Sequence, residues 1–280
     1  MTNFDLYNSI CNTCSKNITQ KYSTSFYSAI KLLHKDLHQP IFNIYGFVRV
    51  ADEIVDTFHN FNKQELFIDF KTETLKAINN GISLNPVLNS FQQTVNEYNI
   101  DHSLIDAFLY SMEMDLLKKE YTQAEYETYI YGSAEVVGLM CVQIFCEANM
   151  EQYKLLMPYA KKLGAAFQKI NFLRDIKADN ESLQRMYFPN CNFKNFTLDD
   201  KRKIEEDIEE DFANALIGIR KLPTKARFGV YVAYKYYYSL FTKIKSYSPT
   251  KILENRISVP NYSKALIVAN ASIKYKFNLL

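Results

Sequence analysis

The sequence predicts a single all-α domain, and three observations support this fold class. Hydrophobic residues make up 48% of the 280 residues, which is enough to bury a sizeable core. The chain has only 7 Gly and 7 Pro, so long helices are favoured over glycine-rich loops. Apolar residues recur with a helical period along the chain, and only short stretches alternate with period two. We therefore expect one domain over residues 1–280, without internal repeats or linkers.

The expected helices follow this apolar period and are interrupted by single prolines or short polar turns. In order, they cover residues 4–18, 20–36, 40–59, 63–79, 85–98, 101–118, 122–149, 151–180, 198–220, 224–246 and 260–277. Prolines mark the starts near residues 40, 85, 224 and 260, and polar turns separate the others. The stretch SLQRMYFPNCNF at 182–193 follows a polar helix end and is expected to form an ordered functional loop.

Charge and cysteine usage exclude several classes of protein. The net charge is +2, from 33 basic and 31 acidic residues, which gives no reason to expect a nucleic acid partner. No G-x-x-x-x-G-K-[ST] or G-x-G-x-x-G motif is present, so nucleotide binding is unsupported. The five cysteines form no disulfide framework, and the lone C-x-x-C of Cys11 and Cys14 lacks a second pair.

The sequence also bears on location. Its first residues, MTNFDLYNSI, lack the basic start and apolar run of a signal peptide. The longest apolar stretch, at 136–146, is too short to span a bilayer and contains Gln143. We expect a cytoplasmic protein, with peripheral attachment to the inner membrane face left open and the oligomeric state undetermined.

The stretch IYGFVRVADEIVD at 44–56 places a polar stripe on one helical face. At about 100° per residue, its members lie within roughly 60° of one another. They are Tyr45, Arg49, Asp52 and Asp56. A second such stripe lies in QKINFLRDIKAD at 168–179, and Arg174 sits beside it. Its members are Gln168, Asn171, Asp175 and Asp179.

Two facing stripes would bring four carboxylates around one cavity, which is strongly unfavourable in a low-dielectric site without a cation. Mg²⁺ prefers oxygen ligands and commonly bridges carboxylates to phosphates. Arg49 and Arg174 would hold the remaining phosphate oxygens. The pattern therefore indicates a metal–diphosphate site, with a pair of solvated helix faces as the alternative. A zinc site at His34 and His38 is disfavoured because no third ligand lies nearby.

Five blocks in order resemble the squalene/phytoene synthase family, and the likeness covers nearly the whole chain. They are YSTSF at 22–26, the two aspartate-rich stretches, YIYGSAEVVGLMC at 129–141 and RMYFP at 185–189. The likeness is greatest to bacterial phytoene synthases. Tyr22 stands where many relatives have His, and Ser133 and Glu135 also depart from the usual pattern.

The resemblance implies an isoprenoid-synthase helical bundle around a central cavity. It implies Mg²⁺, with Mn²⁺ as a substitute, prenyl diphosphate substrates and no NADPH. The implied metal ligands are Asp52, Asp56, Asn171, Asp175 and Asp179. The implied catalytic residues are these four aspartates and Tyr129. The implied substrate contacts are Tyr22, Ser23, Thr24, Ser25, Tyr45, Arg49, Gln168, Arg174, Arg185, Tyr187 and Tyr237.

The expected activity is that of a phytoene synthase in carotenoid biosynthesis. Such an enzyme condenses two geranylgeranyl diphosphates head to head through prephytoene diphosphate. The first alternative is a dehydrosqualene or presqualene diphosphate synthase that uses the shorter farnesyl diphosphate. A more distant alternative, from another class, is an inactive helical scaffold subunit, against which the intact aspartates argue.

Overall fold

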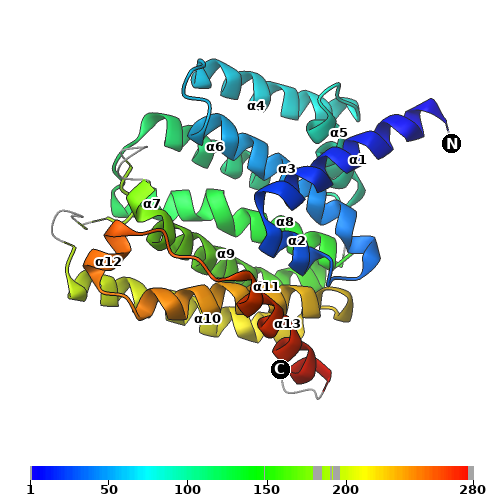
Figure 1. The fold of residues 1–280 in the computed structure, drawn as a ribbon. Helices are drawn as coiled ribbons and strands as arrows, with labels where there is room; N and C mark the ends of the chain where they lie inside the picture. The colour runs from blue at the N-terminus through cyan, green and yellow to red at the C-terminus, as the bar shows by residue number, and fades with distance from the viewer. Residues whose placement is uncertain (1, 148, 179–184, 190, 192–195, 277–280) are drawn as a thin grey trace.

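The computed structural model describes residues 2–147, 149–178, 185–189, 191 and 196–276. These residues form an α-helical bundle (Figure 1). Within them no β-strand forms, and a single isolated bridge joins Glu120 to Met186. The helices are α1 Asn3–Tyr22, α2 Thr24–Ile30, α3 Lys35–Asp56, α4 Lys63–Asn80, α5 Pro86–Glu97, α6 His102–Leu117, α7 Gln123–Ile130, α8 Val136–Phe145, α9 Met150–Ala178, α10 Leu198–Lys221, α11 Thr224–Lys245, α12 Pro249–Glu254 and α13 Asn261–Lys276, with a π-helical turn, η1 Tyr131–Glu135, before α8.

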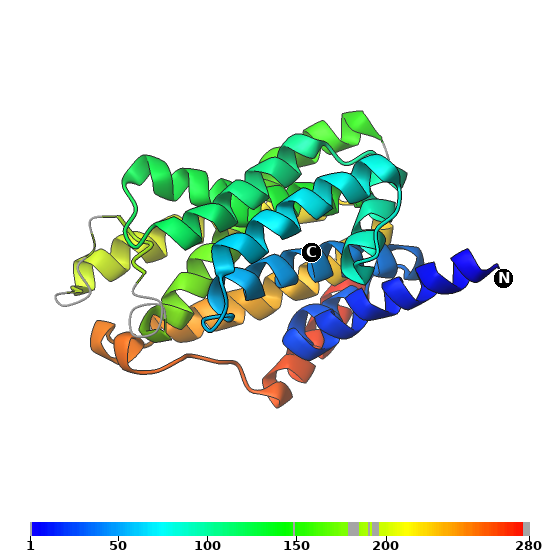
Figure 2. The same ribbon diagram turned by 90° about the horizontal axis from the view of Figure 1, so that it is seen from above.

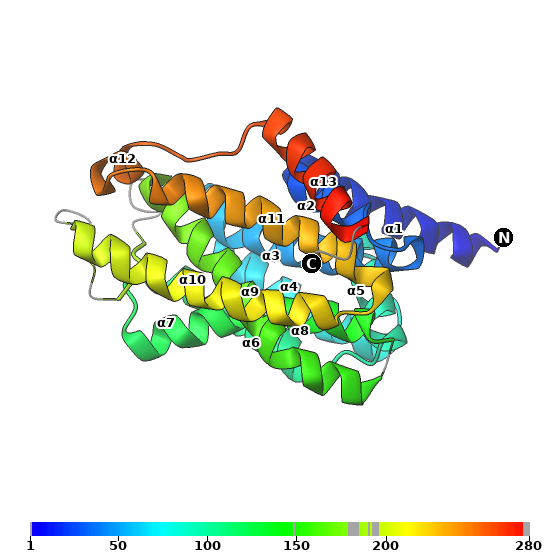
Figure 3. The ribbon, with the colours of Figure 1, turned by 90° about the horizontal axis from the view of Figure 1, so that it is seen from below.

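The bundle has two halves that share α3 and α8. In one half, α1 packs against α3 and α5, and α4 and α6 cover the far side. In the other half, α9 packs against α8 and α10, and α11 contacts α2, α9 and α10. The view from below shows α9, α10 and α11 next to one another (Figure 3), and the view from above shows α4 and α6 on the opposite side of the molecule (Figure 2). This arrangement confirms the predicted all-α bundle.

Opposite faces of α3 serve the two halves. Phe47 is fully buried and stacks on Phe91 with ring centroids 3.8 Å apart, and it also contacts Phe70 and Phe108. These contacts make an aromatic core with α4, α5 and α6. Such a core fixes α3 firmly, because aromatic side chains bury large areas and pack with defined ring geometry. The opposite face of α3 is therefore held rigidly toward α9 and α11.

Several helix boundaries differ from the sequence-based expectation. The helix expected at 20–36 is divided, because Ser23 ends α1 and caps α2 by accepting a hydrogen bond from the Phe26 N–H at 3.2 Å. Helix α3 begins at Lys35, before Pro40, because burial of Leu37 and Ile41 extends the helix past the proline. The expected helix at 122–149 contains the π-turn, and α12 was not expected.

The continuous stretch Gln123–Phe145 is the single described helical segment with the length and apolar composition to cross a membrane. It covers α7, η1 and α8. Within its apolar window 67% of the residues are buried inside the bundle, as in the core helix of a folded domain. Its π-turn lies against α9, where a Cβ on Gly164 would meet the Ala134 carbonyl oxygen at 2.6 Å. Glycine at that position therefore allows α9 to approach η1 closely.

Candidate functional site

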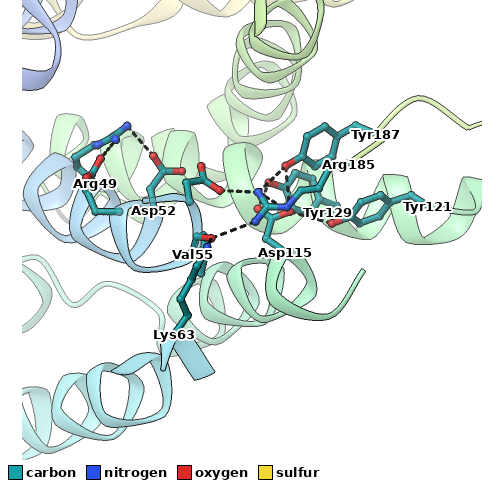
Figure 4. Close-up of polar contacts among 11 residues, drawn as sticks. Arg49, Asp52, Val55, Lys63, Asp115, Tyr121, Tyr129, Arg185 and Tyr187 are labelled. Carbon is teal, nitrogen blue, oxygen red and sulfur yellow. Dashed lines mark hydrogen bonds and ion pairs between the residues drawn. The ribbon is translucent and has the colours of Figure 1, made fainter. Parts of the chain in front are cut away.

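The carboxyl-terminal end of α3 carries the first predicted stripe. Arg49 donates to Asp52 at 2.7 Å and also pairs with Glu53. Its guanidinium lies 4.4 Å from the ring centroid of Tyr22, so it is held between a carboxylate pair and an aromatic face. Asp56, one turn beyond Asp52, accepts a bond from Arg185 at 2.5 Å. Figure 4 shows Arg49 and Asp52 on this helix, and Arg185 reaching it from the other side.

Asp52 is the most perturbed carboxyl group of this stripe. Burial, followed by the neighbouring charge of Asp56, raises the pKa of Asp52 to about 7, although Arg49 opposes the shift. The side chain still keeps 35% of its surface exposed, so it lies at the rim of the site rather than deep inside it. Crowded carboxylates with a raised pKa indicate an unmet demand for positive charge, which a bound cation would satisfy.

The second stripe lies on α9. Asn171 accepts a hydrogen bond from the Tyr237 hydroxyl at 3.2 Å and donates to Gln168 at 3.3 Å. Arg174 donates through Nε to Asp175 at 2.9 Å. Burial alone would lower the pKa of Arg174, but its contacts with Asp175 and Tyr237 outweigh burial and raise the pKa. The guanidinium therefore stays charged in this partly enclosed place.

Aromatic contacts bring the two stripes to the same end of the bundle. Phe26 of α2 lies 5.8 Å from Tyr45 of α3 and 5.7 Å from Tyr237 of α11, measured between ring centroids. Phe167 of α9 stacks on Tyr237 at 3.9 Å. Burial raises the pKa of Tyr45 to about 12, so its phenol is protonated at neutral pH. Helices α2, α3, α9 and α11 thus meet around one polar rim.

An apolar cavity of about 290 Å³ opens beneath this rim. Its wall on α9 runs from Asn171 and Gln168, at the rim, down to Leu156. Helix α3 contributes Tyr45 and Val48 at the rim, and the remaining lining is almost entirely apolar. Such a cavity under a charged rim fits a molecule with an anionic head and a long hydrocarbon tail.

A buried charged cluster adjoins the rim on the side of α6. Asp115 accepts hydrogen bonds from Tyr129 at 2.6 Å, Tyr121 at 2.9 Å and Tyr187 at 3.1 Å, as Figure 4 shows. Arg185 lies 3.8 Å from Asp115. Burial raises the pKa of Asp115 to about 6, against the opposing charge of Arg185. The cluster fixes residues 185–187 against α3 and α6.

Burial disfavours the charge of Arg185, but Asp115, Tyr187 and Asp56 together raise its pKa. Arg185 also donates to the Val55 carbonyl oxygen at 3.2 Å, which Lys63 Nζ reaches at 2.8 Å. One guanidinium thus links the RMYFP segment to the first aspartate-rich stretch. Tyr129 faces this cluster and is absent from the cavity lining.

The amino-terminal block lies at the other edge of the rim. Tyr22 is 51% exposed and covers Arg49, while the hydroxyl of Ser23 is used as the helix cap of α2. Thr24 Oγ1 accepts a bond from Lys264 of α13 at 3.4 Å. Ser25 is half-buried in the first turn of α2. Tyr22 thus joins this block to Arg49 at the rim, and the Ser23 hydroxyl has a structural role as a helix cap that the sequence did not reveal.

The donor set at the rim suits a hard cation, since it offers carboxylate and amide oxygens. Within the described part of the chain, however, no three His, Cys, Asp or Glu side chains gather closely enough to hold a metal ion. Asp52, Asp56 and Asp175 instead form ion pairs with arginines, namely Arg49, Arg185 and Arg174 respectively. The predicted ligand Asp179 lies outside the described residues. The rim therefore offers oxygen ligands that suit Mg²⁺, but in this structure its arginines occupy the carboxylates through ion pairs.

Sequence reasoning missed two residues at the site. Asp115 stands in the mostly apolar stretch SMEMDLL, where it is one of two acids beside Glu113, so the local pattern gave little signal. Arg256, after α12, donates to Asp175 at 2.8 Å from a side chain that is 71% exposed. It lies 81 residues from its partner in sequence, so no local pattern could have paired them.

Comparisons with known proteins identify the family of this chain. The profile of the family described as squalene/phytoene synthase matches residues 19–263. A 4,4'-diapophytoene synthase of Staphylococcus haemolyticus (strain JCSC1435) is 22% identical, over 92% of this chain and 95% of that protein. A phytoene synthase of Arthrospira platensis is 24% identical, over 92% of this chain and 91% of that protein.

The crystal structure of a dehydrosqualene synthase in complex with a ligand has the same fold. It superposes with a TM-score of 0.83 at 20% identity, covering 98% of this chain and 99% of that chain. The matched region contains both aspartate-rich stretches and the segment with Arg185. The chain therefore belongs to the squalene/phytoene synthase family of prenyltransferases, which condense prenyl diphosphates head to head.

Proposed function

We propose that the protein is a phytoene synthase, which condenses two geranylgeranyl diphosphates to phytoene in a Mg²⁺-dependent reaction without NADPH. The observation that carries the proposal is the combination of the charged rim with a deep apolar wall on α9. From Leu156 to Asn171 this wall is about 22 Å long at about 1.5 Å per residue. Both ends of the wall belong to one continuous helix, α9.

The length of the wall supports the C20 substrate. Three bonds of an extended chain span about 3.6 Å, so a four-bond isoprene unit spans about 5 Å. A geranylgeranyl tail of four units would then be about 19 Å long, and a farnesyl tail of three units about 14 Å. The cavity wall accommodates the longer tail with its diphosphate near Asn171.

The rim residues divide the chemical tasks. Asp52, Asp56, Asp175 and Asn171 would hold Mg²⁺, which neutralises charge on the departing diphosphate when bound. Arg49 and Arg174 provide planar donors for the phosphate oxygens, and both already lie at the rim. Together they favour the charge that develops on the leaving group.

The apolar wall has a different task. Loss of diphosphate from an allylic substrate leaves a carbocation, which water would quench. The rings of Phe26, Phe167 and Tyr237 cover the top of the cavity and offer π-faces to a cation. Arg185, bonded to Asp56, holds residues 185–187 over the neighbouring side and limits the entry of water.

The second candidate is a dehydrosqualene synthase that uses farnesyl diphosphate. It is favoured by the similarity to the diapophytoene synthase and to the dehydrosqualene synthase structure. A farnesyl tail also fits a cavity that accepts the longer chain, so this candidate differs in the preferred substrate and keeps the same rim.

Steady-state release of diphosphate tests the proposal. The purified protein is given geranylgeranyl or farnesyl diphosphate with and without Mg²⁺, and kcat/KM is compared. We expect Mg²⁺-dependent turnover with a higher kcat/KM for the C20 substrate. Asp52→Ala and Asp175→Ala should each abolish turnover while leaving the circular dichroism spectrum unchanged.

Each other outcome points elsewhere. A higher kcat/KM for farnesyl diphosphate would favour the second candidate. Substantial turnover in both aspartate variants would contradict the assignment of the rim. No turnover with either substrate, in a folded protein, would support an inactive scaffold.

A further inference from the structure

Helix α13 is apolar on both of its faces. On its inner face Ala271 is buried, Ile267 and Val268 pack against the core, and Tyr275 contacts Phe228 of α11 at 5.0 Å between ring centroids. On its outer face three large side chains are exposed: Tyr262 by 71%, Leu266 by 67% and Ile273 by 58%. Large apolar side chains that gather on an exposed helix face are typical of an interaction surface.

The three exposed side chains form a stripe. Their spacing of four and seven residues places them within roughly 60° of one another at about 100° per residue. Lys274 and Lys276, both exposed, stand at the carboxyl-terminal end of the same helix. We call Tyr262, Leu266, Ile273, Lys274 and Lys276 the α13 face. Figures 1 and 3 show α13 on the outside of the bundle, across α2 and α11.

The segments around the α13 face contain an excess of basic residues. Helix α13 has no Asp or Glu, and neither do the helices it contacts, α11 and α2. From residue 222 to residue 280 the chain has a single acidic residue, Glu254. Its basic residues there are Lys225, Arg227, Lys235, Lys243, Lys245, Lys251, Arg256, Lys264, Lys274 and Lys276. This excess is local, because the whole chain has a net charge of only +2.

Some of these cations are close together. Burial, followed by the charge of Lys274, lowers the pKa of Lys235 on α11. Lys225, Lys245 and Arg256 pair with acids of other segments, whereas α2, α11 and α13 themselves contain no Asp or Glu. An exposed apolar stripe within a basic surface is the pattern of a helix that lies in the plane of an anionic membrane.

We propose that the α13 face docks on the surface of an anionic lipid bilayer, with Tyr262, Leu266 and Ile273 inserted at the headgroup boundary. Lys274 and Lys276 contact lipid phosphates beside the inserted stripe. Lys264, at the other end of α13, bonds Thr24 in the block at the cavity rim. The docked helix therefore begins beside the rim. If the proposed function holds, an apolar product leaves the cavity next to the bilayer.

The test is co-sedimentation of the full-length protein with vesicles. One set contains phosphatidylcholine mixed with phosphatidylglycerol, and the other contains phosphatidylcholine alone. We expect binding to the mixed vesicles, weaker binding to the neutral ones, and loss of binding with added salt. Leu266→Ser with Ile273→Ser should lower the vesicle partition coefficient about tenfold or more. Lys274→Glu with Lys276→Glu should lower it about fivefold or more at low salt.

Matched controls come from residues of equal exposure elsewhere. Leu198 is 69% and Ile68 is 60% exposed, so Leu198→Ser with Ile68→Ser removes the same kind of surface far from α13. Lys76→Glu with Lys154→Glu makes the same change of net charge on α4 and α9. Both control proteins should bind vesicles like the unchanged protein.

Three results would overturn the proposal. The first is failure of the unchanged protein to bind the mixed vesicles, and the second is binding by the α13 variants that equals that of their controls. Alternatively, sedimentation velocity without lipid would show a dimer that Leu266→Ser with Ile273→Ser dissociates, which would assign the face to a second copy of the chain. Vesicle binding is measured without substrate, so this test is independent of the proposed activity.

Discussion

Among single residues, Asp52 shows most clearly that the carboxylates at the rim lack sufficient positive charge around them. Asp52 has a pKa of about 7, well above its ordinary value of 3.8, because of burial and the charge of Asp56. A carboxyl group whose folded pKa is raised stabilises the fold fully only below its ordinary value. That contribution is lost as pH rises through about 7.

Asp52→Asn should therefore stabilise the protein at high pH. In the absence of metal and substrate, we expect its Tm to exceed that of the unchanged protein by about 2 °C at pH 8, a small value because solvent still reaches the side chain. The difference should vanish near pH 4. Asp69→Asn, an exposed aspartate on α4, is the control and should shift Tm little at either pH. A lower Tm for Asp52→Asn at pH 8 would contradict the claim that burial and the charge of Asp56 destabilise the ionised Asp52.

Arg49→Lys tests the phosphate fork. Lysine keeps the charge but loses the planar pair of donors and the ring contact with Tyr22. We expect kcat/KM to fall about 10- to 100-fold, since a hydrogen bond to a charged group contributes about 1.5–3 kcal/mol. Arg202→Lys, at an exposed ion pair on α10, should leave kcat/KM unchanged. Unchanged kinetics in Arg49→Lys would show that Arg49 does not bind phosphate.

The same residues show how far sequence reasoning reaches. The stripes of α3 and α9 could be predicted because helical periodicity fixes which side chains share a face. The role of Asp115 could not be predicted, because it depends on hydrogen bonds from Tyr121, Tyr129 and Tyr187, which lie outside α6. Arg256 could not be paired with Asp175 for the same reason.

At the level of single helices, α9 would set the length of the substrate tail in the proposed reaction. Its cavity face runs from Asn171 at the rim to Leu156, and Ala160 lies about 16 Å below Asn171 at about 1.5 Å per residue. That depth is beyond the end of a farnesyl tail of about 14 Å and short of the end of a geranylgeranyl tail of about 19 Å. We therefore expect the side chain at 160 to distinguish the two substrates.

Ala160→Phe should shorten the cavity. We expect the ratio of kcat/KM for the C20 substrate to that for the C15 substrate to fall about tenfold or more. The control is Lys161→Phe, because Lys161 is one residue further along α9 and outside the cavity lining. Ala165→Phe would not serve, because that alanine is buried in the core. The ratio for Lys161→Phe should not change. An equal fall in kcat/KM for both substrates in Ala160→Phe would indicate damage to packing. It would contradict the claim that the side chain at 160 limits the tail length.

Boundaries between elements were less predictable than the elements. Most helices were found from their apolar period, but Pro40 misled because tertiary packing carries α3 past it. The π-turn of η1 has no marker in YGSAE, and it arises where α9 packs closely against this segment. Helix α12 has six residues, too few for a period to be detected.

At the scale of the whole molecule, residues distant in sequence converge on one rim. The RMYFP segment is bound to α3 through Arg185 and Asp56, which are 129 residues apart. Met186 N–H donates to the Lys119 carbonyl oxygen at 2.7 Å, which fixes the same segment to the end of α6. Closure of the site and the fold of the bundle are therefore coupled through a few bonds.

Arg185→Ala tests whether the bonds that hold residues 185–187 against α3 exclude water from the site. We expect loss of the bonds to Asp56 and Val55 to lower kcat more than tenfold and to expose reactive intermediates to water, giving prenyl alcohol as a side product. Gas chromatography of the extracted products would measure the ratio of alcohol to hydrocarbon. A proportionate fall in both products would show that Arg185 has no part in excluding water.

The most direct test of the account is identification of the hydrocarbon product. The purified protein is incubated with geranylgeranyl diphosphate and Mg²⁺, without NADPH, and the extract is analysed by mass spectrometry. We expect a C40 hydrocarbon with the mass of phytoene, absent when Mg²⁺ is chelated. A C30 hydrocarbon from farnesyl diphosphate alone, with none from the C20 substrate, would contradict the claim that α9 measures a geranylgeranyl tail.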